Sequence, residues 1–228
     1  MTCRAVTLDV YAALFDTPGS LAGVLEELFR RRGVTEDRHL VAQTWRQKHR
    51  EYLLVANSLS REPASNRQAI EASARYVLRR LTPPLTAEEV QTLVGAWEHL
   101  RPWPEVAGVL QAIRARPLAL AALSNGDREM LRTLLTALPV PFDHIVSTEG
   151  GQFKPHPSVY RKALDILGVR AEELLHVAGA ATDAMGATAV GIRTVWVNRS
   201  RDVAMDTRLT PTHEVPDLRG VLHFIDAS

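Results

Sequence analysis

The chain has 228 residues, of which 46% are hydrophobic, and its 27 Lys and Arg residues balance 26 Asp and Glu residues to a formal net charge of +1. That length suits one α/β core with a smaller appended domain. The balanced charge argues against a general nucleic-acid or membrane-surface role, because both require a clustered basic excess.

Cysteine content and apolar runs indicate the compartment. Cys3 is the only cysteine, so the chain cannot form an internal disulfide and does not require an oxidising compartment. An apolar strand begins within a few residues of the N-terminus, which leaves no room for a signal peptide. No apolar run approaches the length that spans a bilayer. We therefore expect a cytoplasmic protein that does not contact membranes.

The first predicted strand, Ala5–Leu8, is short and wholly apolar, and it delivers Asp9 at its C-terminal end. From residue 20 to about residue 100 the apolar spacing becomes helical, with no convincing strand. Four helices are expected there: one ending at Gly33, one over about 39–59, one ending before Pro83, and one starting at the Thr86 cap.

Strands and helices alternate after Pro102 and Pro104. Apolar runs at 118–123, 144–147, 174–178 and 194–197 are separated by helices at 105–115, 129–138, 157–167 and 182–190. Such alternation predicts a parallel sheet covered by helices on both faces. We therefore expect an α/β core built from residues 1–15 and 101–228, with a helical cap inserted over residues 16–100.

Polar side chains that follow the strands are the candidate site residues, because ligands bind at the C-terminal ends of parallel strands. Asp9 there is either an ordinary cap or a carboxylate nucleophile that forms an ester. Ser124 and Asn125, next to Gly126, form either a plain turn or an anion site. Tyr11 follows Asp9 at the same edge.

Three charged residues complete the candidate set, each with an ordinary structural alternative. Lys154 is either an ordinary solvated lysine or a site residue that holds Asp9 ionised. Asp183 would compensate a helix dipole, or would activate water. Arg46 would lie on an exposed helix face, or would face the site. The histidines show no metal-ligand spacing, so no metal or other cofactor is expected.

These residues stand in motifs that resemble the L-2-haloacid dehalogenases, the type II haloacid dehalogenases of the haloacid dehalogenase superfamily. The segment Asp9–Asp16 reads Asp-Val-Tyr-Ala-Ala-Leu-Phe-Asp, which is similar to that family's Asp-x-Tyr-Gly-Thr-Leu-Phe-Asp. The other matches are Trp45-Arg46-Gln47-Lys48, Leu123-Ser124-Asn125-Gly126, Lys154-Pro155 with Tyr160, and Asp183-Ala184 followed by Trp196-Val197-Asn198-Arg199.

The resemblance covers nearly the whole chain and implies a Rossmann-like core with a helical cap. It also implies that Asp9 attacks the halogen-bearing carbon of a small 2-haloalkanoic acid, and that water then hydrolyses the ester. On that basis Ser124 holds the substrate carboxylate, while Arg46 and Asn125 receive the halide. Lys154 positions Asp9, Asp183 helps to activate water, and Tyr11 and Tyr160 line or brace the site.

The sequence departs from the family at supporting positions. The family's Gly-Thr is Ala12-Ala13, and its Ser and Asn before the last Asp align with Ala178 and Ala180. Its aromatic residue aligns with Thr182, and two apolar cap positions align with Arg50 and Ser65. We therefore expect dehalogenation that is weak or shifted in substrate.

The alternatives are a catalytically impaired relative that acts as a binding protein, a hydrolase of another small 2-substituted acid, and a superfamily phosphatase. The phosphatase is the least favoured, because such enzymes place a second Asp where this chain has Tyr11. The expected partner is a small anionic substrate. Members of the resembled family often form dimers, but the sequence shows no unambiguous interface stripe, so a homodimer stays open.

Overall fold

The computed structural model describes residues 3–59 and 64–226, and its centre is a six-stranded sheet in which every paired neighbour is parallel. The strands are β1 (Ala5–Leu8), β2 (Ala119–Ser124), β3 (His144–Ser147), β4 (Leu174–Ala178), β5 (Arg193–Val197) and β6 (His213–Val215). The sequence predicted the first five. The sixth was missed, because three residues carry too little periodicity to stand out from a loop.

The strand order β3-β2-β1-β4-β5-β6 reverses direction at β1. Leu8 pairs with Ala122 on one side and with Val177 on the other. Asp9 therefore emerges at the switch point of the sheet, where open α/β folds bind their ligands.

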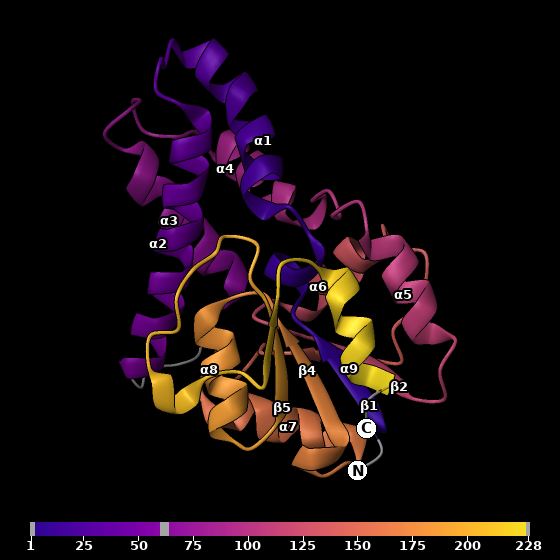
Figure 1. Cartoon of the computed structure of the whole chain (residues 1–228). Helices are drawn as coiled ribbons and strands as arrows, with labels where there is room; N and C mark the ends of the chain where they lie inside the picture. Colours follow the sequence, from indigo (N-terminus) through magenta and orange to yellow (C-terminus); the bar gives the residue numbers. More distant parts are fainter. Residues whose placement is uncertain (1–2, 60–63, 227–228) are drawn as a thin grey trace.

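Helices cover both faces of the sheet (Figure 1). Apolar contacts place α5 (Val106–Arg114), α6 (Arg128–Leu135) and α9 (Leu222–Asp226) on one face. They place α7 (Pro157–Leu167) and α8 (Ala181–Ala189) on the other. Because each face is buried, β1 and β2 are apolar almost throughout rather than alternating.

Four helices between β1 and β2 stand over one end of the sheet (Figure 1). They are α1 (Thr17–Arg32), α2 (Arg38–Ser58), α3 (Asn66–Leu78) and α4 (Ala87–Gly95). Local signals fix their ends: Gly33 adopts a left-handed φ of 64° after α1, and Ser65 and Thr86 each complete a capping box. Their apolar residues join the main core cluster, so the helical part and the core share one continuous apolar interior.

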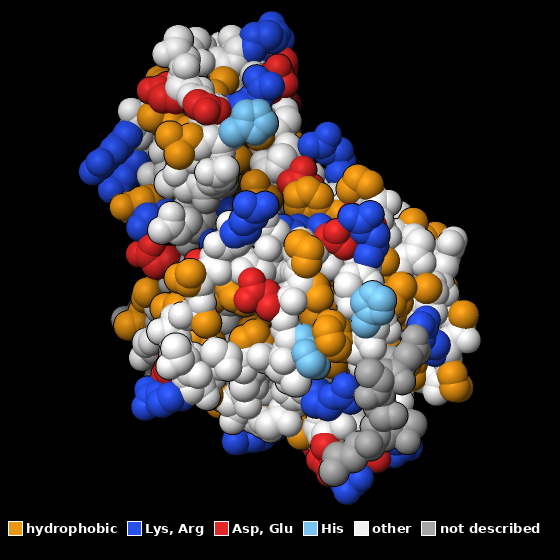
Figure 2. All heavy atoms as spheres, in the orientation of Figure 1, with side chains coloured by type: hydrophobic (Ala, Val, Ile, Leu, Met, Phe, Trp, Pro, Cys, Tyr) orange, Lys and Arg blue, Asp and Glu red, His pale blue; other side chains and the backbone are white. Residues whose placement is uncertain are grey.

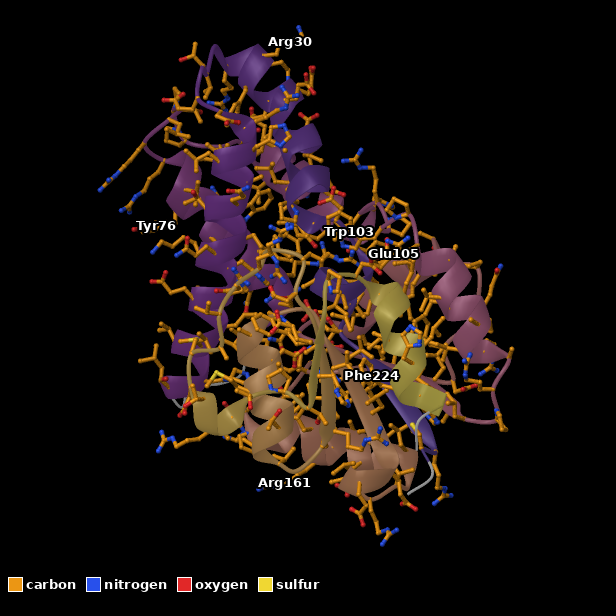
Figure 3. All side chains as sticks on the ribbon, in the orientation of Figure 1. Arg30, Tyr76, Trp103, Glu105, Arg161 and Phe224 are labelled. Carbon is orange, nitrogen blue, oxygen red and sulfur yellow. The ribbon has the colours of Figure 1, made fainter. Side chains whose placement is uncertain are left out.

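Two connections join the helical part to the core, and they lie side by side. Phe15 forms an antiparallel bridge with Pro102, and the Trp103 amide donates to the Leu14 carbonyl at 3.0 Å. Trp103 and Glu105 lie close to the foot of the helical part (Figure 3). The division of the chain at residues 15 and 101 stays a prediction, and this pairing lies beside it.

Arg199, which follows β5, contacts the same junction. Its guanidinium donates to the Ala13 carbonyl at 3.1 Å and to Glu105 at 2.5 Å, and it stacks on the Trp103 ring.

On the face shown in Figure 2, Lys and Arg are interspersed with Asp and Glu over both parts of the molecule. Within the described residues, no helix combines the length and hydropathy needed to cross a membrane.

Candidate active site

Lys154 bridges two carboxylates at the C-terminal edge of the sheet. Its Nζ lies 2.8 Å from Asp9 Oδ1 and 2.7 Å from Asp183 Oδ2, and it also donates to the Leu123 carbonyl at 2.9 Å. All three ammonium N–H groups are thus used. The three charged side chains retain only 5–9% exposure, so the pairing occurs largely out of water.

Protonation of this cluster follows from its charges. Burial alone would lower the pKa of Lys154, but Asp183 and Asp9 outweigh it and raise that pKa above its usual value. Burial would raise the pKa of Asp183, yet Lys154 and then His176 hold it well below its usual range. The site therefore contains an ammonium and an ionised Asp183 at neutral pH.

Asp183 receives further support from residues behind it. The Tyr160 hydroxyl donates to Asp183 Oδ1 at 2.8 Å. His176 Nε2 lies 3.2 Å from Asp183 Oδ2, outside hydrogen-bond geometry, and His176 Nδ1 lies 2.9 Å from Thr7 Oγ1. The sequence analysis missed His176, because nothing in a strand pattern marks one polar residue as facing a site.

A single π-helical turn, Val10–Leu14, follows the nucleophile candidate. Asp9 caps it by accepting the Ala12 amide N–H on Oδ2 at 3.1 Å, which leaves both carboxylate oxygens engaged and oriented. Gly179 lies against this turn so closely that a Cβ there would come within 2.4 Å of the Ala13 nitrogen. Such turns are frequent at functional sites.

Arg46 enters the site from α2. Its guanidinium carbon lies 5.8 Å from the Tyr11 ring centroid and 5.4 Å from that of Trp97, and its Nη1 donates to His49 Nδ1 at 2.8 Å. Burial and then the nearby Arg50 lower its pKa to about 10, so it stays charged at neutral pH. Arg46 lines the pocket wall, and its role in the site stays a prediction.

The Arg46 contact continues into the core through uncharged groups. Burial and then Arg46 hold the pKa of His49 well below its usual range, so the ring is neutral and donates from Nε2 to Asn66 Oδ1 at 2.8 Å. The backbone N–H of Asn66 donates to Asp127 Oδ1 at 2.8 Å. These hydrogen bonds hold the Arg46 guanidinium over the sheet edge. His49 is the second site residue that the sequence did not indicate.

An open pocket of about 340 Å³ lies between α2 and the sheet edge. Seven of the eight predicted site residues line it: Asp9, Tyr11, Arg46, Ser124, Asn125, Lys154 and Asp183. The exception is Tyr160, which lies behind Asp183 and is positioned to brace that carboxylate rather than to contact a ligand.

Polar atoms in the pocket wall lack partners among the described residues. The Tyr11 and Ser124 hydroxyls are buried and accept or donate no hydrogen bond there. Asn125 instead holds the Lys154 backbone, accepting its N–H at 2.7 Å and donating to its carbonyl at 3.2 Å. Buried unpaired hydroxyls cost stability, so their retention points to a polar ligand.

A family model of haloacid dehalogenase-like hydrolases matches residues 4–191. The chain belongs to the haloacid dehalogenase-like hydrolases. An (S)-2-haloacid dehalogenase of Pseudomonas sp. (strain YL) is 33% identical over 228 residues, which cover 99% of this chain and 95% of that protein. An L-2-haloacid dehalogenase crystal structure from Xanthobacter autotrophicus aligns with a TM-score of 0.86 at 27% identity, covering 98% of both chains. That of the L-2-haloacid dehalogenase RSc1362 aligns with a TM-score of 0.90 at 28% identity, covering 99% of both.

This haloacid dehalogenase-like hydrolase also shows what surrounds its alanine departures. Ala178 packs in an apolar cluster with Trp196, Ala181 and Ala184, so its surroundings are apolar. Ala180 and Thr182 do line the pocket. Lys154 is held by Asp9, Asp183 and the Leu123 carbonyl, and Asp183 is held by Lys154 and Tyr160, without any contribution from positions 178 and 180.

Proposed function

We propose that the chain hydrolyses the carbon–halogen bond of small 2-haloalkanoic acids through an ester on Asp9. The observation that carries this proposal is the Asp9 carboxylate, oriented by Lys154 and the Ala12 amide at the base of a pocket whose wall contains Arg46. The family membership and the dehalogenase relatives support it.

The reaction proceeds in two displacements. An Asp9 carboxylate oxygen forms a bond to C2 of the substrate while the carbon–halogen bond breaks and the halide leaves with the electron pair. Water then attacks the Asp9 carbonyl carbon, and the C2 oxygen departs as the hydroxyl of a 2-hydroxy acid. Asp9 returns to a carboxylate and one proton is released. The ester splits one difficult step into two easier ones.

Arg46 stabilises the departing halide. The guanidinium is held by the neutral His49 and has no carboxylate partner among the residues described, so its charge is available to an incoming anion. The substrate carboxylate then binds the unpartnered Tyr11 and Ser124 hydroxyls. This leaves C2 between Asp9 and Arg46, as an in-line displacement requires.

Lys154 and Asp183 serve the second displacement. Lys154 donates a hydrogen bond to Asp9 before attack and remains beside the ester afterwards. Asp183 accepts hydrogen bonds from Lys154 and Tyr160, which leaves part of its roughly four acceptor positions free to orient water. Because its pKa is low, Asp183 orients the water more than it removes a proton from it.

The donor set does not suit a magnesium ion, which the superfamily phosphatases use. Within 3–59 and 64–226, no three His, Cys, Asp or Glu residues are grouped to hold a metal. Asp9 and Asp183 share an ammonium instead, and Tyr11 stands where those enzymes have an acid. Magnesium demands near-octahedral oxygen ligands. We expect no EDTA-sensitive hydrolysis of p-nitrophenyl phosphate, and such an activity would contradict the dehalogenase proposal.

Oxygen-18 labelling tests the ester directly. In a single turnover of 2-chloropropionate in labelled water, the 2-hydroxy acid should contain no label, and Asp9 should acquire it. Asp9→Asn should abolish halide release while its circular dichroism spectrum stays that of the unmodified chain. Label in the first-turnover product would mean that water attacks C2 itself. Absence of halide release from every 2-chloro, 2-bromo and 2-fluoro acid would favour a binding protein.

A further inference from the structure

We propose that the pocket accepts 2-halo acids that carry a second carboxylate, and that Arg50 binds this second carboxylate. The inference rests on the proposed dehalogenation, because the substrate shares the pocket and the Asp9 nucleophile. It specifies the shift in substrate that the altered pocket wall produces, and it makes Arg50 a specificity-determining residue.

Helix α2 crosses the pocket mouth between two anchors. At one end Arg46 lies over Tyr11, and at the other the Asn57 amide exchanges two hydrogen bonds of 2.8 Å with the Phe153 backbone. Arg50 lies between these anchors, about 6 Å beyond Arg46 along the helix axis. Arg50 lines the pocket, and the helix that presents it is held by contacts on both sides of it.

The two guanidiniums on this helix face lack acidic partners. Neither Arg46 nor Arg50 has a carboxylate within ion-pair distance in the part of the chain that the structure describes, although most other arginines there do. Like charges one helical turn apart destabilise a helix, and Arg50 contributes to the lowered pKa of Arg46. An anion bound near both would relieve this repulsion.

A monocarboxylate substrate leaves Arg50 without a role. The halide occupies Arg46, and the first carboxylate occupies the Ser124 and Tyr11 hydroxyls. The remaining substituent on C2 faces the rest of the pocket, which measures about 340 Å³. This is roughly eleven water volumes, and it exceeds the needs of a three-carbon acid. A carboxylate on that substituent meets Arg50 with complementary charge.

Two acidic residues, Glu51 and Asp202, also line the pocket, and they offset the charge of the arginines only in part. Glu51 is paired with Lys48 at 2.7 Å. Asp202 lies on the loop after β5, where its Oδ1 accepts the Val203 amide at 2.8 Å. Near the mouth, Arg46 and Arg50 therefore outnumber the single unpaired carboxylate of Asp202. Ser65, the other altered cap position, caps α3 and does not line the pocket.

The chemistry is that of the proposed reaction. Asp9 displaces chloride from C2 of 2-chlorosuccinate, and water cleaves the ester to give 2-hydroxysuccinate, chloride and a proton. The second carboxylate takes no part in bond making, and Arg50 affects only how tightly the substrate and transition state are held. A reaction that forms 2-halodicarboxylates must precede this step.

The test compares 2-chlorosuccinate with 2-chlorobutyrate, which has the same chain length without the second charge. The unmodified enzyme should give the higher kcat/KM on 2-chlorosuccinate, and Arg50→Leu should reduce that preference about tenfold, as expected for one charge-assisted hydrogen bond partly open to solvent. Asp202→Asn should increase the preference. Arg38→Leu removes a cation from the same helix away from the pocket and should leave it unchanged.

A binding arm separates this inference from the proposed function. Succinate should bind more tightly than butyrate in calorimetry, and Arg50→Leu should remove the difference even if no haloacid is turned over. Equal binding of the two acids, or an unchanged preference in Arg50→Leu, would overturn the role of Arg50. Failure to release halide from any 2-haloacid, with succinate bound through Arg50, would refute dehalogenation alone.

Discussion

His176 Nε2 lies 3.2 Å from Asp183 Oδ2, the oxygen that also accepts from Lys154. The ring reaches this position because His176 on β4 pairs in register with Thr7 on β1, and its Nδ1 lies 2.9 Å from the Thr7 hydroxyl. With the Thr7 hydroxyl donating to Nδ1, Nε2 presents its N–H toward Asp183. His176 thus supports the carboxylate from the position beneath it.

We predict that His176→Phe lowers kcat on 2-chloropropionate by roughly tenfold or more, the scale of losing a partner that orients an active-site ligand. Because His176 helps to hold the Asp183 pKa low, the acid limb of the kcat profile should move to higher pH in this variant. His176→Gln retains an amide donor and should recover part of the activity. A purely structural role would leave the pH profile unchanged.

Arg46→Lys should lower kcat about a hundredfold, as for other residues that stabilise a developing anion. A single ammonium cannot reproduce the planar fork that donates to His49 while facing the halide. The measurement is halide release at saturating 2-chloropropionate, with circular dichroism as the folding control. Activity within a factor of about two would refute the halide role of Arg46.

Ala180→Asn should raise kcat on 2-chloropropionate severalfold, because Ala180 lines the pocket and an amide there can hold the attacking water. Ala178→Ser should not, since position 178 packs against Trp196 in an apolar cluster. A hydroxyl buried there without a partner costs about 1–3 kcal/mol of stability. Equal gains from both substitutions would show that the two positions do not differ in this way.

Gly179→Ala should destabilise the protein by about 1–3 kcal/mol and reduce activity, because its Cβ would meet the turn that follows Asp9. Gly108→Ala is the matched control. A Cβ at Gly108 meets nothing within 4 Å, and the residue lies within α5, so this change should stabilise the fold by about 0.5–1 kcal/mol. Urea unfolding midpoints of the two variants measure the contrast.

Glu89 links α4 to the end of α1 and gives a pH-dependent contribution to stability. Arg32 and the Thr86 amide lower the pKa of Glu89 to about 2. Because the folded pKa lies below the unfolded value of 4.5, the contribution is present above about pH 4.5 and is lost as pH falls toward 2. Glu89→Gln should lower the urea midpoint at pH 7. Its difference from the unmodified chain should vanish near pH 2, and a constant difference would contradict this linkage.

The sequence by itself determined the α/β class, five of the six strands, the four inserted helices and the residues at the sheet edge. These features are set by local signals: apolar periodicity, capping boxes at Ser65 and Thr86, and the left-handed glycine at position 33. Parallel topology then brings Asp9, Lys154 and Asp183 to one edge without further information.

Only the tertiary structure decided which groups complete the site. Thr7 and His176 meet across 169 residues of sequence, and Arg46 finds its neutral partner only because Asn66 orients His49. The tertiary structure also places Tyr160 behind Asp183 and Arg50 at the pocket mouth. Such contacts depend on strand register and on how α2 lies across the sheet, and local periodicity specifies neither.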